Sequence, residues 1–471
     1  MRIVLISPKG PLYRNRGGIF KKNLRYAPIT LPMLAALVPP ELNAEIVLVD
    51  EGIEDVDPNI EADLIGMTTI TGSANRTYEL ADGFRARGIP VVLGGPHPTL
   101  VPDDAQPHAD AIVTGYAEQT WPQLLRDFAA GEMKSRYDQG SDFNLDDLPM
   151  PRWDLVDGRR FMTTQVYEAT RGCPHSCEFC VVPAAWGRTP YQRPVEQVVE
   201  EIKQRGSKRI VFVDLNLIAN LPHAMELFEA LIPLKLKWFG LASVNLFRKE
   251  KLLQLMARSG CVGLLIGFES LSEASLGGMN KGFNTVDQEA GTEEGYADLT
   301  RQLHQHGISL MATWVFGNDD DTTEIFERTA KFNVRAAVDL PRYAIATPFP
   351  GTALYKRLEA EGRILTKDWD LYDGQHVVFQ PKNMSAEQLE AGTRAAWQYT
   401  YRRRSMLRRL AISRTQLQTN IVANIGYRFY AHHLETHYNC DWIIGGKDES
   451  RLWRPNLTNL TRFFAPGKSS T

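Results

Sequence analysis

The chain has 471 residues, which is too long for one ordinary domain and predicts two or three. Hydrophobic residues make up 43% and charged residues 23%, as in globular proteins, and the formal net charge of −3 argues against nucleic-acid binding. Three of the five cysteines lie close together, which argues against a secreted disulfide framework and for metal-binding thiolates in the reducing cytoplasm.

Residues 1–135 alternate short apolar runs with helical stretches. The runs are rich in β-branched residues and end in Gly, Pro, Asp or Ser, a pattern typical of strands. Strands are predicted at residues 2–7, 45–50, 64–69, 91–94 and 111–114. Helices are predicted at residues 75–87 and 118–130. This alternation predicts a doubly wound, flavodoxin-like α/β domain that binds its ligand at the carboxyl ends of the strands.

Small and polar residues crowd the ends of the third, fourth and fifth of these strands. Glycines at such ends let the backbone approach a large ligand, and a helix N-terminus can receive a phosphate group. The residues in these positions are Thr68, Thr69, Thr71, Ser73, Gly94, Gly95, His97, Gly115, Tyr116 and Glu118. The alternative is a flavodoxin-like domain in which the glycines have only a structural role.

A second alternating series follows a polar, irregular segment at residues 136–165, which we interpret as a linker. Its strands are predicted at residues 166–170, 209–213, 238–243, 262–267, 309–316 and 342–347. Six such units are enough for an open, partial (β/α)6 barrel over residues 166–365, with its chemistry at the carboxyl ends of the strands. Residues 366–471 no longer alternate and predict a helical C-terminal region.

The three clustered cysteines, Cys173, Cys177 and Cys180, follow the first strand of the second series. Three thiolates on one short loop can hold three irons of a [4Fe–4S] cluster and leave the fourth iron open to the amine and carboxylate of an amino acid. The alternative is a structural zinc site with His175 or a distant cysteine as fourth ligand. Spacers of three and then two residues are unusual for zinc, so the loop favours the cluster.

This loop resembles the signature of the radical S-adenosylmethionine superfamily, Cys-x-x-x-Cys-x-x-aromatic-Cys, in which Phe179 is the aromatic residue. Further landmarks follow strand ends in the family's order. The resemblance implies that Asp214 and Asn216 lie where the family contacts the methionine amine. It also implies that Ser243 lies near the ribose and that Glu269 meets polar groups of the cofactor. An external electron donor of the flavodoxin or ferredoxin type is implied as well.

The N-terminal domain is similar to the cobalamin-binding domain that precedes many such enzymes. In that group a Gly-Gly-x-His-Pro loop, a Gly-x-x-Glu turn and a Thr/Ser loop recur, which implies cobalamin contacts at the strand-end residues named above. Proteins of the methionine-synthase kind ligate cobalt through the histidine of Asp-x-His-x-x-Gly. Residues 7–14 have neither Asp nor His. We therefore expect no cobalt ligand there, and we do not assign His97 to cobalt.

Together the two resemblances imply a cobalamin-dependent radical enzyme that methylates an unactivated carbon of a small or lipid-like molecule. One S-adenosylmethionine would supply the methyl group to cobalamin, and a second would supply the radical that abstracts a substrate hydrogen. One alternative is an enzyme of the same architecture that forms a ring, rearranges a skeleton or oxidises. Another is a non-catalytic cobalamin or metal sensor, which would not need an open iron.

An arginine-rich stretch lies in the C-terminal region. Its members are Arg402, Arg403, Arg404, Arg408, Arg409 and Arg414. The usual interpretation is a solvated helix face, and the sharper one is contact with a membrane surface. The second interpretation would make a cytoplasmic enzyme a peripheral membrane protein.

Overall fold

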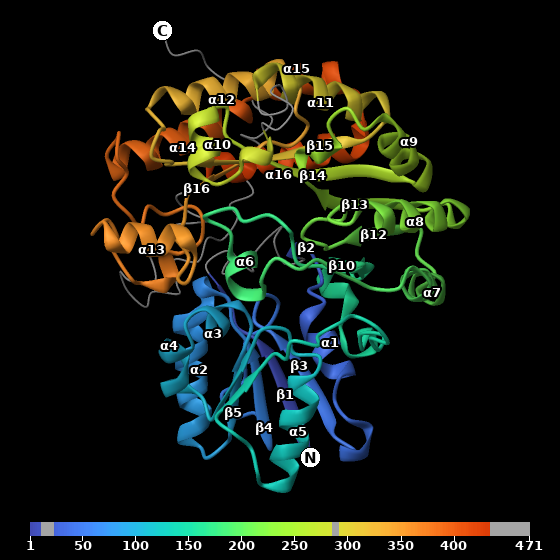
Figure 1. The fold of residues 1–471 in the computed structure, drawn as a ribbon, viewed down its shortest axis with the longest axis vertical. Coiled ribbons are helices and arrows are strands. Elements are labelled where there is room, and N and C mark those ends of the chain that lie inside the picture. Colours follow the sequence, from blue (N-terminus) through green and yellow to red (C-terminus); the bar gives the residue numbers. More distant parts are fainter. Residues whose placement is uncertain (11–22, 285–291, 434–471) are drawn as a thin grey trace, which may run out of the picture.

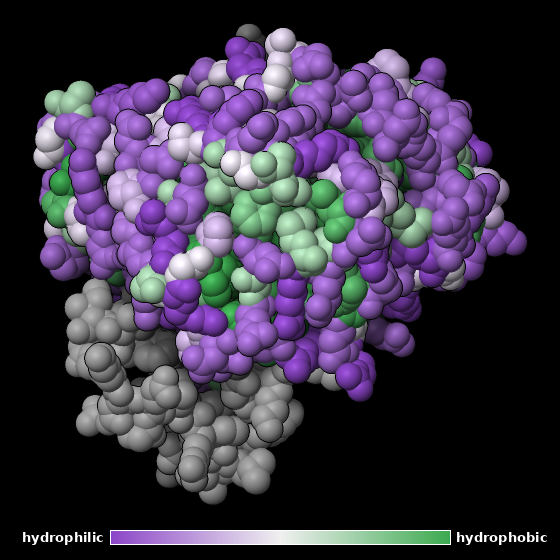
Figure 2. All heavy atoms as spheres, turned by 90° about the horizontal axis from the view of Figure 1, so that it is seen from below, coloured by the Kyte–Doolittle hydropathy of each residue, from purple (hydrophilic) through white to green (hydrophobic). Residues whose placement is uncertain are grey.

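The structure of the chain, a computed structural model, describes residues 1–10, 23–284 and 292–433. The N-terminal domain lies at one end of the molecule, and the second sheet with the C-terminal helices lies at the other (Figure 1). Seen from the N-terminal end, the surface is largely hydrophilic with scattered apolar areas (Figure 2). None of the described helices is long and apolar enough to cross a membrane.

The N-terminal domain is built on a six-stranded parallel sheet in the order β3-β1-β4-β5-β6-β7. Its strands are β1 (Arg2–Ser7), β3 (Glu45–Asp50), β4 (Leu64–Thr68), β5 (Val91–Gly94), β6 (Ala111–Thr114) and β7 (Arg136–Asp138). The five predicted strands are confirmed. The sixth, β7, pairs with β6 and belongs to the segment that we interpreted as a linker. The strand order reverses between β1 and β4, the kind of position where doubly wound sheets bind ligands.

Alternation along β1 explains why helices cover both faces of this sheet. Ile3 and Leu5 pack in one apolar core with residues of α1 (Thr30–Ala36) and α5 (Thr120–Ala130). Val4 and Ile6 pack in the other core with residues of α2 (Ala74–Ala86). Successive side chains of a strand point to opposite faces, so an uninterrupted apolar run requires cover on both sides.

The second domain contains a six-stranded parallel sheet in the order β16-β15-β14-β13-β12-β9, and it confirms the predicted series. Its strands are β9 (Val166–Tyr167), β12 (Arg209–Phe212), β13 (Lys237–Ala242), β14 (Cys261–Glu269), β15 (Ser309–Phe316) and β16 (Arg342–Ile345). The connecting helices include α7 (Val195–Arg205), α8 (Leu221–Leu231), α9 (Glu250–Ser259), α11 (Glu293–Gln305) and α12 (Glu324–Arg335). Because all strands run in parallel, their carboxyl ends share one edge.

Shorter elements surround that edge. A two-stranded antiparallel pair joins β10 (Thr170–Arg171) to β11 (Tyr191–Gln192), and β2 (Asn23–Tyr26) pairs in parallel with β8 (Phe161–Thr163). Short helices include α3 (Pro96–Leu100) of the first domain, and α6 (Val181–Trp186) and α13 (Ala353–Ala360) further along the chain.

The C-terminal region is helical, as predicted, with α14 (Ala386–Thr400), α15 (Arg403–Ser413) and α16 (Leu417–His432). Before these helices the chain returns to the N-terminal domain. There Trp369 joins that domain's apolar core and its Nε1 donates to Asp104 Oδ2 at 3.1 Å. Asn75 Nδ2 donates to Asp368 Oδ1 at 2.9 Å. The first domain is therefore tied to a segment more than 260 residues later in the chain.

Candidate active site

The three cysteines of the motif lie on the loop between β10 and α6 and are partly buried. The loop has little regular structure but is held by its neighbours. The backbone N–H of Glu178 donates to the Met279 carbonyl at 2.9 Å, and the Glu178 carboxylate pairs with Arg357 at 2.7 Å. Asn280 Nδ2 donates to the Ser176 carbonyl at 2.9 Å. These contacts fix the loop beside the carboxyl edge of the second sheet.

The electrostatics of the loop disfavour bare thiolates. Burial raises the pKa of Cys180 to about 12 and also raises the pKa of Cys177, so both remain protonated near neutral pH without a cation. Among the described residues, no three His, Cys, Asp or Glu side chains are already gathered into a metal-binding group. The donor set itself fits an iron–sulfur cluster, because soft thiolates are the ligands that such clusters take.

Neighbouring strand ends bring together the residues predicted to contact S-adenosylmethionine. Asp214 and Asn216 follow β12, Ser243 follows β13 and Glu269 ends β14, and these three strands are adjacent. Asp214 is 1% exposed, and its Oδ1 accepts the backbone N–H groups of Ala169, at 3.0 Å, and of Thr170. Burial, followed by the charge of Glu168, raises the pKa of Asp214 to about 7.

Three of these four residues present a buried polar atom without a hydrogen-bond partner among the described residues. The atoms are Asp214 Oδ2, Asn216 Oδ1 and Ser243 Oγ. Buried polar atoms are nearly always satisfied, and an unsatisfied one costs about 1–3 kcal/mol. A ligand with an ammonium group and hydroxyls would satisfy all three, so these residues fit S-adenosylmethionine.

Glu269 is already paired, with a lysine that the sequence analysis missed. Lys281 Nζ lies 2.6 Å from Glu269 Oε1 and donates to the Gly267 carbonyl at 3.0 Å, and both side chains are buried. Glu269 also adopts a left-handed backbone conformation with φ of +66°, which is costly for a residue with a side chain. Backbone strain of this kind is frequent at ligand sites. The sequence around Lys281 contains no local pattern that would have predicted its contact with Glu269.

A cavity of about 460 Å³ opens between the two domains. From the first domain it is lined by six of the residues predicted to contact cobalamin: Thr68, Gly94, Gly95, Gly115, Tyr116 and Glu118. From the second domain it is lined by Glu168, Thr170, Arg171, Trp186, Val213 and Leu215. The last strand before the cysteine loop, β10, therefore borders the same space as the loops of the first domain.

Two glycines on this wall cannot be replaced without a clash. A Cβ on Gly95 would lie 2.9 Å from the backbone N and O of Thr69, and its φ is +100°. A Cβ on Gly115, whose φ is +76°, would lie 2.5 Å from Gln139 Oε1. Both positions thus require glycine for conformation and for space.

Arg171 connects the first domain to the cysteine loop and was not singled out from the sequence. Its guanidinium pairs with Glu118 and, at 2.8 Å, with Glu168, and it lies over the Tyr116 ring at 5.3 Å. Tyr116 in turn stacks on Trp186 with ring centroids 5.5 Å apart. Tyr116 Oη and Glu118 Oε2 are buried without a partner among the described residues. In a cavity whose lining is otherwise largely apolar, these two unpaired polar atoms would be satisfied by a large cofactor that carries polar groups.

The structure does not bring Thr69, Thr71 and His97 to the wall of this cavity. His97 is fully buried, and its Nε2 lies 2.9 Å from Tyr78 Oη and 3.1 Å from Asp104 Oδ2. Its Nδ1 lies 3.3 Å from Thr71 Oγ1. Asp104 also binds Trp369, so this histidine belongs to the network that ties the C-terminal half to the first domain.

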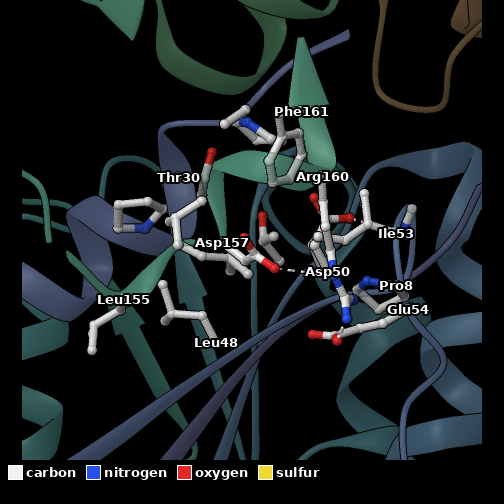
Figure 3. A pocket seen from close by; sticks show the side chains of 18 of the residues that line it. Pro8, Thr30, Leu48, Asp50, Ile53, Glu54, Leu155, Asp157, Arg160 and Phe161 are labelled. Carbon is white, nitrogen blue, oxygen red and sulfur yellow. Dashed lines mark hydrogen bonds and ion pairs between the residues drawn. The ribbon is translucent and has the colours of Figure 1, made fainter. Parts of the chain in front are cut away.

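A second cavity, of about 320 Å³, lies over the ends of β3, β1 and β4 and shares Pro28, Thr30, Thr68 and Ile70 with the first. Figure 3 shows Arg160 reaching toward Glu54, to which its Nη1 is bonded at 2.7 Å. Residues 7–14 form the loop in which we expect no cobalt-ligating histidine. The loop lines this second cavity as far as Gly10, and residues 11–14 lie outside the described residues.

Two protein-family models match this chain over the two domains that line the cavity, one over each. The model of the radical SAM superfamily matches residues 167–331, and that of the B12 binding domain matches residues 28–125. A domain of unknown function, DUF4070, matches residues 352–462.

The chain is similar to curated enzymes and solved structures. It is 30% identical over 374 residues to the bacteriochlorophyllide d C-12(1)-methyltransferase of Chlorobaculum tepidum, which covers 77% of this chain and 80% of that protein. It shares its fold with TsrM of Kitasatospora setae, a radical S-adenosylmethionine methyltransferase solved with cobalamin and a [4Fe–4S] cluster. The TM-score is 0.61 and the sequence identity 18%, and the alignment covers 76% of this chain and 78% of TsrM. OxsB, a cobalamin-dependent radical enzyme, aligns at a TM-score of 0.63 and 14% identity over 98% of this chain and 83% of that one.

Proposed function

Because this chain belongs to the cobalamin-dependent methyltransferases of the radical S-adenosylmethionine superfamily, we propose that it transfers a methyl group to an unactivated carbon of a small or lipid-like molecule. The observation that carries the proposal is the shared cavity. Its walls come from the predicted cobalamin loops on one side and from the strand before the cysteine loop on the other. A methyl group can reach a carbon radical only if both cofactors flank the same carbon at near-contact distance.

Bound cofactors supply the chemistry: the cluster supplies the electron that cleaves S-adenosylmethionine, and cobalamin carries the methyl group. We propose that Cys173, Cys177 and Cys180 hold the cluster. Asp214 offers its free carboxylate oxygen to the ammonium group of S-adenosylmethionine, and that positive charge draws the carboxyl to its ionised form. Asn216 and Ser243 offer their unpaired oxygens to the rest of the same molecule.

On the opposite wall, Thr68, Gly94, Gly95, Gly115, Tyr116 and Glu118 form the proposed cobalamin contacts. Arg171 carries one positive charge between two carboxylates, which fixes the first domain against the second at the place where the two cofactors meet. An electron donor of the flavodoxin or ferredoxin type would reduce the cluster in the cytoplasm.

The test is an assay of the anaerobically reconstituted protein with S-adenosylmethionine and a low-potential reductant. Methylation consumes two molecules and yields both S-adenosylhomocysteine and 5′-deoxyadenosine. The matched control replaces all three motif cysteines with Ala, which should abolish 5′-deoxyadenosine. Formation of 5′-deoxyadenosine without S-adenosylhomocysteine in the cobalamin-loaded protein would instead support the ring-forming, rearranging or oxidising alternative. Formation of neither product would support a sensor.

A further inference from the structure

Helix α16 buries two of its polar side chains and exposes several apolar ones. Asn420 and Asn424 are buried, and their Nδ2 groups donate to Asp339 Oδ1 at 2.9 Å and to the Asp339 carbonyl at 3.1 Å. The outward side chains are Leu417, Ile421, Val422 and Ile425, which are 41%, 44%, 71% and 42% exposed. A surface helix of a water-soluble protein has the opposite arrangement.

Helix α15 also buries a charged side chain and exposes apolar ones, although its Met406 packs in the core. Arg409 is 1% exposed and donates to the carbonyls of Val338, at 2.9 Å, and of Asp339, at 2.7 Å. The interpretation of Arg409 as part of a solvated or membrane-facing surface is therefore wrong, because this arginine satisfies buried carbonyls. By contrast, Leu407 and Ile412 are 68% and 52% exposed on the outer side. We call the outward side chains of α15 and α16 together the α15–α16 face.

The segment that forms α15 and α16 carries charge of one sign. Residues 402–433 contain seven arginines and no aspartate or glutamate. Arg404 and Arg408 are exposed and flank Leu407 one helical turn apart. Among the described residues, neither of these two arginines forms an ion pair within the chain. Exposed basic side chains beside exposed apolar ones favour contact with an anionic lipid surface.

Other occupants of the face fit this charge poorly. A second copy would bring like-charged arginines together across a two-fold axis, which is repulsive. Residues 434–471 carry five Lys or Arg and four Asp or Glu, so their charge does not complement seven arginines. We propose that the α15–α16 face docks the enzyme peripherally on an anionic membrane, with the arginines at the headgroups and Leu407, Ile412 and Val422 inserted between them.

Vesicle binding of the reconstituted full-length protein tests this proposal independently of its chemistry. We expect cosedimentation with phosphatidylglycerol vesicles, little with phosphatidylcholine vesicles, and weakening by salt. Each basic residue near an anionic surface contributes a factor of about five, so the pair Arg404→Gln and Arg408→Gln should weaken binding about 25-fold. Val422→Asp should weaken it at least about tenfold.

Matched controls distinguish the effect of the α15–α16 face on vesicle binding from the effects of total charge and total apolar surface. Lys203→Gln with Lys237→Gln removes the same charge elsewhere, and Met162→Asp changes an apolar side chain that is 64% exposed on β8. Both controls should bind vesicles like the parent. Absence of binding by the parent, or equal loss in the controls, overturns the proposal. A dimer in solution that Val422→Asp dissociates would also overturn it, because the face would then be an interface between copies.

Discussion

Two aspartates are buried to the same extent at opposite ends of the second sheet, Asp214 at 1% and Asp339 at 2% exposure. Asp339 precedes β16, and both of its carboxylate oxygens are satisfied. Its Oδ2 accepts from His304 and the Leu310 backbone N–H, and its Oδ1 accepts from Ser413, Thr415 and Asn420. Asp214 follows β12 and uses only one oxygen, while the other has no partner among the described residues.

The difference separates a structural carboxylate from one kept for a ligand. A carboxylate with all its lone pairs engaged stabilises the fold and has nothing left to bind with. A half-satisfied carboxylate costs stability in the empty protein and recovers it when a cation arrives. Burial alone does not distinguish the two groups, whereas their unpaired atoms do.

The largest expected effect concerns Asp339→Asn. The new amide would place an NH₂ donor against the donors that Asp339 now accepts from, such as the Leu310 N–H and the Ser413 hydroxyl. The hydrogen-bond network that joins the sheet to α15 and α16 would also lose the negative charge at its centre. We expect a loss of about 3–5 kcal/mol in the free energy of unfolding, or roughly 10 °C in melting temperature. The same substitution at Asp214 serves as the control and should cost far less. Equal losses would contradict the comparison.

The second prediction concerns how the stability of the protein depends on pH. The pKa of Asp214 is about 7 in the folded protein and about 3.9 in the unfolded chain. Because the pKa is higher in the folded protein, the protonated form of Asp214 favours the folded state. This contribution to the free energy of unfolding is complete below about pH 4 and is lost as the pH rises toward 7. The ligand-free parent should therefore lose up to about 4 kcal/mol relative to Asp214→Asn between pH 4 and pH 8. Urea unfolding of both proteins across this range measures it, and parallel profiles would exclude the assignment.

Ligand binding gives the third contrast. Asp214→Asn removes the charge that we propose for the ammonium group of S-adenosylmethionine, a charge-assisted bond of about 1.5–3 kcal/mol. The dissociation constant should rise about 10- to 100-fold by calorimetry on the cluster-loaded protein. Iron content should stay unchanged, because Asp214 is not a cluster ligand. Unaltered affinity would remove Asp214 from the site.

Tyr116→Phe should have the smallest effect, with opposite signs in two measurements. The hydroxyl of Tyr116 is buried without a partner among the described residues, so its removal should stabilise the cofactor-free protein by about 1 kcal/mol. If cobalamin satisfies that hydroxyl, the same change should weaken cobalamin binding severalfold. A variant that is less stable in the empty state would show that the hydroxyl already has a partner, such as water.

Local patterns in the sequence predicted what depends on neighbours along the chain. The apolar runs of β1, β3, β5, β6 and β15 ended at the predicted residues, because such runs carry their own boundary signals. The cysteine motif was visible for the same reason. β14 is longer than predicted, and β9 is shorter because the chain leaves the sheet to form β10.

Contacts between distant segments could not be predicted in this way. Arg408 and Arg409 are identical neighbours in the sequence, yet one is exposed and the other buried, because Asp339 and its surroundings, some 70 residues earlier, determine which helix face turns inward. Likewise, Arg171 meets Glu118 from another domain, and Lys281 meets Glu269 across a segment that contains the short helix α10 (Glu273–Gly278). In each case the partner is specified by the fold and not by spacing.

We propose that this one chain holds an iron–sulfur cluster and cobalamin on two sides of one cavity. Metal and cofactor analysis after anaerobic reconstitution tests it most directly, with the parent beside the variant that has Ala at Cys173, Cys177 and Cys180. The parent should hold about four irons, four sulfides and one cobalamin per chain. The variant should lose the iron and the brown colour but keep the cobalamin. A parent that binds zinc without iron, or that takes up no cobalamin, would contradict the account.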